Sequence, residues 1–136
     1  LQGSFLAGMA LEQAVLGLVH GFAHPLGARF HVGHGAACAA CLPAVLRFNR
    51  ETTGGDDPYR EVDAHLGRPI EDFVAEALPQ LRLGNPFAGH LPEDPDAIVA
   101  EVLASGSTAA NPRPVSAGDA RRLLQEIVQP LPDREP

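Results

Sequence analysis

The sequence contains no lysine and no tryptophan, and it has only two cysteines, one tyrosine and one methionine. Without lysine it cannot form the GxxxxGK[ST] phosphate loop, and it also lacks the Gly-x-Ser-x-Gly turn that carries a nucleophilic serine. The two cysteines, Cys38 and Cys41, have no preceding strand of the kind that a thioredoxin-type redox motif needs. We therefore interpret both as small core residues of a helix.

The net charge of −7 is spread unevenly along the chain. Residues 1–50 hold one acidic residue against three arginines, whereas residues 51–136 hold 16 acidic residues against 7 arginines. This balance gives no basic surface for nucleic acid, so we expect no nucleic-acid partner. The nearly neutral first third is typical of a buried or interface-forming segment, and the acidic remainder is typical of a solvated surface.

The apolar start of the chain fits neither a membrane span nor a signal peptide. Residues 1–27 contain Glu12, Gln13 and two histidines, and no basic residue precedes the apolar run. We therefore expect a cytoplasmic protein without a membrane partner. Because the chain begins at Leu1 and not at a methionine, we also expect it to be part of a longer protein.

Apolar residues recur mainly at helical spacing, and no alternation typical of strands persists. The sequence therefore predicts an all-α fold of about six helices in one domain, residues 1–129, followed by a flexible tail, residues 130–136. Proline, glycine and the capping residues Asp57, Asp94 and Ser116 place these helices at 4–24, 35–49, 58–66, 69–83, 95–104 and from 117 onward, with 107–114 extended. Apolar spacing predicts buried faces on the last two helices, formed by Ile98, Val99, Val102 and Leu103 and by Ala120, Leu123, Leu124, Ile127 and Val128.

Two histidines lie one turn apart near the end of the first predicted helix. On a single helix over 4–24, Gln13, Gly17, His20 and His24 form one stripe, and a third histidine, His34, follows a Pro-Gly break. A polar stripe on so apolar a helix is expected inside the protein, where an unpartnered polar group costs roughly 1–3 kcal/mol. Because neutral imidazole is a common ligand of zinc and iron, these histidines predict a metal site.

The remaining histidines give weaker signals. Glu61 and His65 have helical spacing, but their charged surroundings favour a solvated face, and we expect His31 and His90 to face solvent. The run around His34 lacks the third glycine, the preceding strand and the later acidic residue of a dinucleotide-binding fingerprint. Any nucleotide-binding domain is therefore expected outside this chain.

The run GLVHGFAHPLGARFHVGHG, residues 17–35, resembles the signature of the iron-containing (group III) alcohol dehydrogenases. The resemblance extends to residues 6–10, 39–43 and 46–49, and Asn111-Pro-Arg-Pro114 resembles the closing motif of that family. It covers essentially the whole chain, which would correspond to most of the C-terminal helical domain. The thirteen residues between His20 and His34 favour the alcohol dehydrogenase branch over glycerol dehydrogenase and dehydroquinate synthase.

The resemblance implies specific roles for three histidines. His20 and His34 match the last two ligands of a divalent metal, Fe²⁺ or Zn²⁺, while His24 matches the histidine beside the nicotinamide that assists proton transfer. The implied reaction interconverts an alcohol and an aldehyde or ketone with NAD or NADP. The other two ligands of the family, an Asp and a His, and the nucleotide-binding domain would lie before Leu1, so the isolated chain is expected to be inactive.

Two other interpretations remain open at the level of sequence. The chain can be a truncated relative that serves as a non-catalytic binding or assembly module, in which case apolar surface exposed by truncation predicts a homo-oligomer or a partner chain. It can also be a plain helical domain whose histidines are hydrogen-bonded in the core, which predicts no stabilisation by metal.

Overall fold

The computed structural model describes residues 1–51 and 57–129, and within these ranges it contains eight helices and no strand. The all-α prediction is therefore confirmed, and the number of about six helices was too low. The helices are α1 (Gln2–Ala14), α2 (Leu18–Phe30), α3 (His34–Arg50), α4 (Arg60–Leu66), α5 (Ile70–Gln80), α6 (Pro95–Ala104), α7 (Gly106–Ala109) and α8 (Ala117–Val128). The tail predicted at 130–136 lies outside the described residues.

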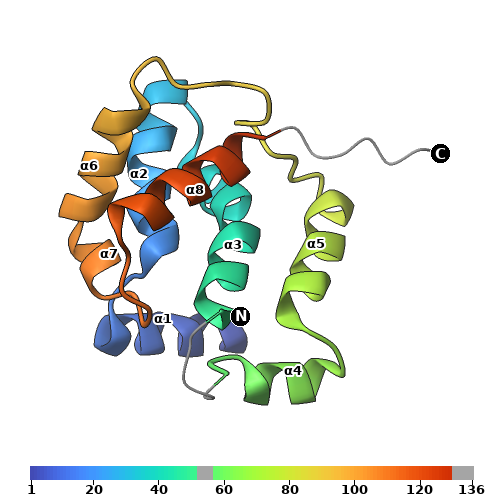
Figure 1. The fold of residues 1–136 in the computed structure, drawn as a ribbon. Coiled ribbons are helices and arrows are strands. Elements are labelled where there is room, and N and C mark those ends of the chain that lie inside the picture. Colours follow the sequence, from blue (N-terminus) through green and yellow to red (C-terminus); the bar gives the residue numbers. More distant parts are fainter. Residues whose placement is uncertain (52–56, 130–136) are drawn as a thin grey trace.

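Helix α2 is central to the packing, as it contacts α3, α6 and α7 (Figure 1). Helix α8 packs across α3 and α6, and α5 packs against the outer side of α3. The fully buried side chains that join these helices are large and apolar: Leu18, Phe22, Leu26, Phe48, Phe87, Ile98, Val102, Leu123 and Ile127. These side chains belong to one hydrophobic core. Burial of each of them stabilises the folded state by about 1.5–3 kcal/mol.

The prediction of a single helix over residues 4–24 is wrong, because the helix is interrupted between α1 and α2. Val15, with a φ of 55°, ends α1, and Gly17 is the residue before α2. The two helices are bent by 98° relative to each other. Gln13 therefore does not continue the stripe of His20 and His24 on one helix.

The predicted stop at Pro25–Gly27 is also wrong, since α2 continues to Phe30 with Pro25 inside it. Proline removes one backbone hydrogen bond from a helix interior, but its ring fixes φ near the helical value, and here the residue is buried. The helix ends at His31, whose φ of 54° is left-handed, and the Gly27 carbonyl accepts hydrogen bonds from the amides of His31 and Val32. This turn reverses the chain into α3.

Other helix boundaries differ more modestly from the prediction. Helix α4 begins at Arg60 and not at Pro58, although the Asp57 carboxylate accepts a hydrogen bond from the Tyr59 amide at 2.9 Å. Helix α5 ends at Gln80, and the short helix α7 occupies part of the segment that was predicted to be extended. The spacing of apolar residues does not show one-turn helices, because four residues are too few to display a period.

The capping residues of α6 and α8 were predicted correctly. Asp94 accepts a hydrogen bond from the Ala97 amide at 2.9 Å, and the side chains and amides of Ser116 and Asp119 form a reciprocal capping box. One residue of the predicted buried face of α6, Leu103, is instead 37% exposed.

A buried amide network ties α2 to α3. The Asn111 side-chain oxygen accepts hydrogen bonds from the Leu18 amide and from the Asn49 side chain, each at 3.3 Å. The Asn111 side-chain nitrogen donates to the Asn49 side-chain oxygen at 2.7 Å and to the Arg113 carbonyl at 2.8 Å. Gly17 offers no side chain to cap α2, so Asn111 supplies the acceptor from a distant part of the chain.

An arginine at the C-terminal end of α3 anchors the helices α4 and α5. The Arg50 guanidinium pairs with Asp57 at 2.6 Å, with Asp63 at 2.9 Å and with Glu71 at 2.6 Å. Hydrogen bonding to Arg50 holds the pKa values of the Glu71 and Asp63 carboxyls below their usual range. Glu71 is only 8% exposed, and it is a charged residue whose burial the sequence pattern did not predict.

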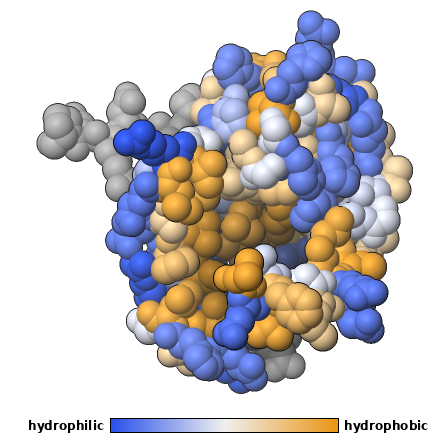
Figure 2. Space-filling model, turned by 180° about the vertical axis from the view of Figure 1, so that it is seen from behind, coloured by the Kyte–Doolittle hydropathy of each residue, from blue (hydrophilic) through white to orange (hydrophobic). Residues whose placement is uncertain are grey.

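Helix α1 lies apart from the core, and residues 1–13 are all exposed. Its large apolar side chains include Phe5, Leu6 and Met9, which are 68%, 63% and 53% exposed. Figure 2 shows apolar residues gathered around a hollow on the back of the molecule. The nearly neutral first third of the chain is therefore divided: α2 and α3 supply residues of the core, whereas α1 faces solvent in this structure.

Among the described residues, no helix taken by itself has the length and apolar character to cross a membrane. Helices α1 and α2 satisfy these criteria only when they are joined, and the sharp bend lies between them.

Candidate metal site

Helix α2 presents two different faces, and these place the histidines. Leu18, Phe22 and Leu26 follow one another at intervals of one turn and are fully buried. His20 and His24 occupy the other side, where His20 is half-buried and His24 is exposed. The expectation that these histidines lie inside the protein is therefore wrong, because the opposite, apolar face of α2 fills the core.

The turn after α2 brings His34 back beside the other two histidines. His34 is the first residue of α3, and α3 packs along α2. The ring centroid of His34 lies 5.1 Å from that of His20 and 5.2 Å from that of His24, and the ring centroids of His20 and His24 lie 5.8 Å apart. Three imidazoles thus meet at one place on the surface between α2 and α3.

The environment of His20 favours its neutral form. Burial, followed by the charges of His34 and His24, lowers the pKa of His20 below its ordinary value of 6.5. A neutral imidazole has a free lone pair on one ring nitrogen, and this is the form that binds metal ions. Burial and the two neighbouring rings therefore favour the ligand form of His20.

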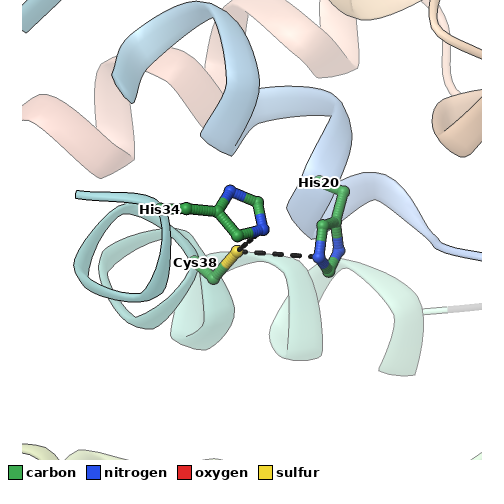
Figure 3. Close-up of side chains that lie close together, drawn as sticks. All are labelled: His20, His34 and Cys38. Atoms are coloured by element: carbon green, nitrogen blue, oxygen red, sulfur yellow. Dashed lines mark hydrogen bonds between the residues drawn. The ribbon is translucent and has the colours of Figure 1, made fainter. Parts of the chain in front are cut away.

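A fourth side chain, which the sequence analysis assigned to the core, also belongs to this group. The Cys38 sulfur lies 3.8 Å from Nε2 of His20 and 3.6 Å from Nε2 of His34, between the two rings (Figure 3). Cys38 is half-buried and packs against the hydrophobic core, so its assignment to the core is correct only in part. Its spacing of four residues from His34 on one helix was the available signal, because such residues share a helix face.

The nitrogen and sulfur atoms form a compact set of donors. One ligand atom each from His20, His34 and Cys38 lies within 4.8 Å of the others, and within the described ranges this is the group of three or more that could hold a metal ion. The group contains no carboxylate. Nitrogen and sulfur donors without oxygen are typical of sites for zinc and related transition metals and not for magnesium or calcium.

The other candidate side chains lie away from this group. Cys41 is buried as predicted, and burial raises the pKa of its thiol to about 12. His65 is exposed on α4, where its Nδ1 is 2.8 Å from the Glu61 carbonyl, so the predicted solvated face is confirmed. His31 and His90 are exposed, also as predicted.

Comparisons with known proteins agree with this architecture. The model of the Fe-containing alcohol dehydrogenase family, C-terminal, matches residues 1–128. The chain is 34% identical to a lactaldehyde reductase of Escherichia coli (strain K12), over 86% of this chain and 34% of that protein. It is 33% identical to the 1-propanol dehydrogenase PduQ of Salmonella typhimurium, over 92% of this chain and 39% of that protein.

A third relative is a 4-hydroxybutyrate dehydrogenase of Cupriavidus necator, 32% identical over 93% of this chain and 36% of that protein. The chain thus spans about a third of the length of the curated relatives it matches. All of them are named as reductases or dehydrogenases, and the matching family model covers the helices that bring the three histidines together. The chain belongs to the Fe-containing alcohol dehydrogenase family and is similar to its C-terminal, helical domain.

Proposed function

We propose that this chain supplies part of the metal centre of an iron-type, NAD(P)-linked alcohol dehydrogenase. The observation that carries the proposal is the convergence of three imidazoles from α2 and α3, with centroids 5.1–5.8 Å apart. The donors fit a divalent transition metal, because neutral imidazole binds both Fe²⁺ and Zn²⁺. The lowered pKa of His20 supports the same conclusion.

In the proposed site His20 and His34 hold the metal, and His24 moves a proton. When bound, the divalent metal supplies Lewis-acid polarisation of the substrate oxygen, while NAD or NADP accepts or donates hydride. His24 is exposed and adjacent to both other rings, so its imidazole can exchange a proton between the substrate oxygen and solvent. His20 is half-buried on a helix whose opposite face packs in the core, which restricts the positions open to its ring.

The names of the relatives suggest the class of substrate. Lactaldehyde, 1-propanol and 4-hydroxybutyrate are small alcohols or aldehydes, and we propose a substrate of this class. Because the chain spans about a third of those proteins, we propose that the nucleotide-binding part and the remaining metal ligands come from outside these residues. The turnover of the chain by itself is then expected to be negligible.

Metal retention by the chain tests the proposed ligands. The metal-free chain is dialysed against Zn²⁺, or against Fe²⁺ without oxygen, and its metal content is measured. His20→Ala and His34→Ala should each abolish retention, whereas His65→Ala, which removes an exposed imidazole on α4, should not. Unchanged metal content in both His20→Ala and His34→Ala would reject the site.

The role of His24 requires a measurement of turnover in the protein that carries this chain. His24→Ala should lower kcat for aldehyde reduction by about 10²–10⁴-fold, the usual contribution of a general acid or base, and should leave the metal content unchanged. Loss of metal together with activity would make His24 a ligand, and unchanged kcat would remove it from the proton path.

The exposed helix α1 favours a second candidate function, that of a non-catalytic assembly module. Its apolar residues would pack against a second copy of the chain, which offers the same surface. Sedimentation should then show a dimer or larger species that Phe5→Asp dissociates. A monomer at all concentrations would contradict this candidate and would leave the metal site untouched.

A further inference from the structure

The thiol of Cys38 contacts both of the histidines that the proposed function assigns to the metal. Its sulfur lies 3.8 Å from Nε2 of His20 and 3.6 Å from Nε2 of His34, and Figure 3 shows it between the two rings. Both contacts are hydrogen bonds between a thiol and an imidazole. Each ring therefore directs its Nε2 at the same sulfur.

One thiol can satisfy both rings at the same time. A thiol has one hydrogen to donate, and its sulfur is also a weak acceptor. A neutral imidazole has one nitrogen that carries a hydrogen and one nitrogen with a free lone pair. The thiol can therefore donate its hydrogen to the Nε2 of one ring while its sulfur accepts a hydrogen from the Nε2 of the other.

The fold keeps Cys38 in place between the rings. The residue lies one turn after His34 on α3, and its half-buried side chain packs against the hydrophobic core. Burial also raises the pKa of the Cys38 thiol, so the thiol keeps the hydrogen that it donates. The hydrogen-bonded group is therefore built by the packing of α2 against α3.

A metal ion at this site has to compete with these hydrogen bonds. An imidazole binds a metal through the lone pair of a nitrogen that carries no hydrogen. The Nε2 that accepts the thiol hydrogen uses its lone pair for that bond, and the Nε2 that donates to the sulfur has no free lone pair. Each Nε2 can therefore bind a metal only after its hydrogen bond with Cys38 is broken.

We propose that Cys38 is a positioning residue that holds His20 and His34 in a hydrogen-bonded arrangement and thereby lowers the metal affinity of the site. This inference rests on the proposed metal site and leaves its ligand set unchanged. Hydrogen bonds that exist only before the metal binds reduce the fraction of the chain that is ready to bind, and the apparent affinity falls by that fraction. One hydrogen bond of ordinary strength corresponds to a factor of about two to ten.

The neighbouring thiol provides a matched control. Cys41 lies three residues after Cys38 on the same helix but is fully buried within the hydrophobic core. Each thiol is replaced by alanine, so the two variants undergo the same chemical change, and the hydrogen bonds to His20 and His34 come from Cys38.

The affinity of the reduced 136-residue chain for Zn²⁺, measured by competition with a chelating dye, tests the proposal. The affinity should rise about two- to tenfold in Cys38→Ala, because the competing hydrogen bonds are gone, and should not change in Cys41→Ala. A lower affinity in Cys38→Ala would make the sulfur a ligand and overturn the proposal. Equal affinity in Cys38→Ala and the wild type would overturn it as well.

Infrared absorption gives an independent measurement, because the S–H stretching band of a thiol moves to lower frequency when the thiol donates a hydrogen bond. The chain has two cysteines, so in Cys41→Ala this band comes from Cys38 alone. Binding of Zn²⁺ should move the band to higher frequency without removing it. A band that vanishes would mean that the thiol loses its hydrogen to become a ligand, and a band that does not move would mean that the thiol does not compete with the metal. Either result would overturn the proposal.

The same measurements separate this proposal from the proposed function. If Cys41→Ala binds Zn²⁺ and the additional replacement His20→Ala abolishes binding, the metal site stands, and the behaviour of the S–H band then decides the role of Cys38 alone. Absence of Zn²⁺ binding in the wild type and in both cysteine variants would overturn the metal site and, with it, the competition by Cys38.

Discussion

Replacement of Asn111 by alanine should destabilise the protein severely, although the residue lies outside the helices, shortly after α7. Its side chain makes four hydrogen bonds, with the Leu18 amide, the Arg113 carbonyl and both polar atoms of the Asn49 amide. Both asparagines are buried, at 8% and 6% exposure. The substitution therefore leaves the first amide of α2 without its partner, and it removes two hydrogen bonds from the Asn49 side chain, which keeps its hydrogen bond with Tyr59.

The expected magnitude follows from these two groups. A buried polar group that loses its partner costs about 1–3 kcal/mol, so Asn111→Ala should lower the free energy of unfolding by about 2–6 kcal/mol. This is a large fraction of the 5–15 kcal/mol that stabilises a typical domain. Part of the cost is shared with Asn49, so the double variant with Asn49→Ala should lose less than the sum of the single variants.

Urea denaturation of the metal-free chain, followed by circular dichroism, measures both effects. Gln125→Ala is the matched control, because it removes an exposed amide side chain from α8 and should change the free energy by less than about 0.5 kcal/mol. A loss in Asn111→Ala no larger than that of the control would refute the role of the network. Strictly additive losses at positions 49 and 111 would refute the coupling between them.

Three further predictions concern other contacts. A Cβ at Gly21 would lie 2.1 Å from the Thr108 hydroxyl, so Gly21→Ala should lower the free energy of unfolding of the wild type. In a Thr108→Ala background, where the hydroxyl is absent, the same substitution should raise the free energy of unfolding by up to about 1 kcal/mol, because alanine favours a helix more than glycine does. Equal effects in the two backgrounds, measured by urea denaturation, would exclude the clash. Arg50 lowers the pKa of the Glu71 carboxyl in the folded protein. The stabilisation that the ionised Glu71 carboxylate gives is therefore complete above the ordinary carboxyl pKa of 4.5, and it is lost as the pH falls through the lower pKa of the folded state. The melting temperature of Glu71→Gln should accordingly fall less with acid than that of the wild type, and parallel curves would contradict this. Saturating Zn²⁺ should raise the melting temperature of the chain, and His34→Ala should remove the increase; an equal increase in the variant would place the bound zinc elsewhere.

The fold class and the positions of several helices could be predicted from the sequence because they depend on local properties. Asp94 with Pro95, and Ser116 with Asp119, are capping signals that act within one turn, and both helices begin where these signals place them. The apolar spacing in α8 likewise predicted its buried face.

The breaks in the chain could not be predicted in the same way. Val15 carries no local stop signal and yet ends a helix, whereas Pro25 is a residue that commonly stops a helix and yet lies inside one. In each case the tertiary environment decides: Asn111 supplies the cap that lets α2 start at Leu18, and burial in the core stabilises α2 beyond its proline.

For the candidate site, the sequence by itself determined which imidazoles are available and that His20 and His24 share one face of a helix, because helix geometry fixes the positions of residues four apart. Only the tertiary structure decided that this face is open to solvent, that the turn at His31 returns His34 to the same place, and that Cys38 joins it. The physical reason is that contacts between α2 and α3 depend on how both helices pack on the core, and no local pattern of residues encodes that packing.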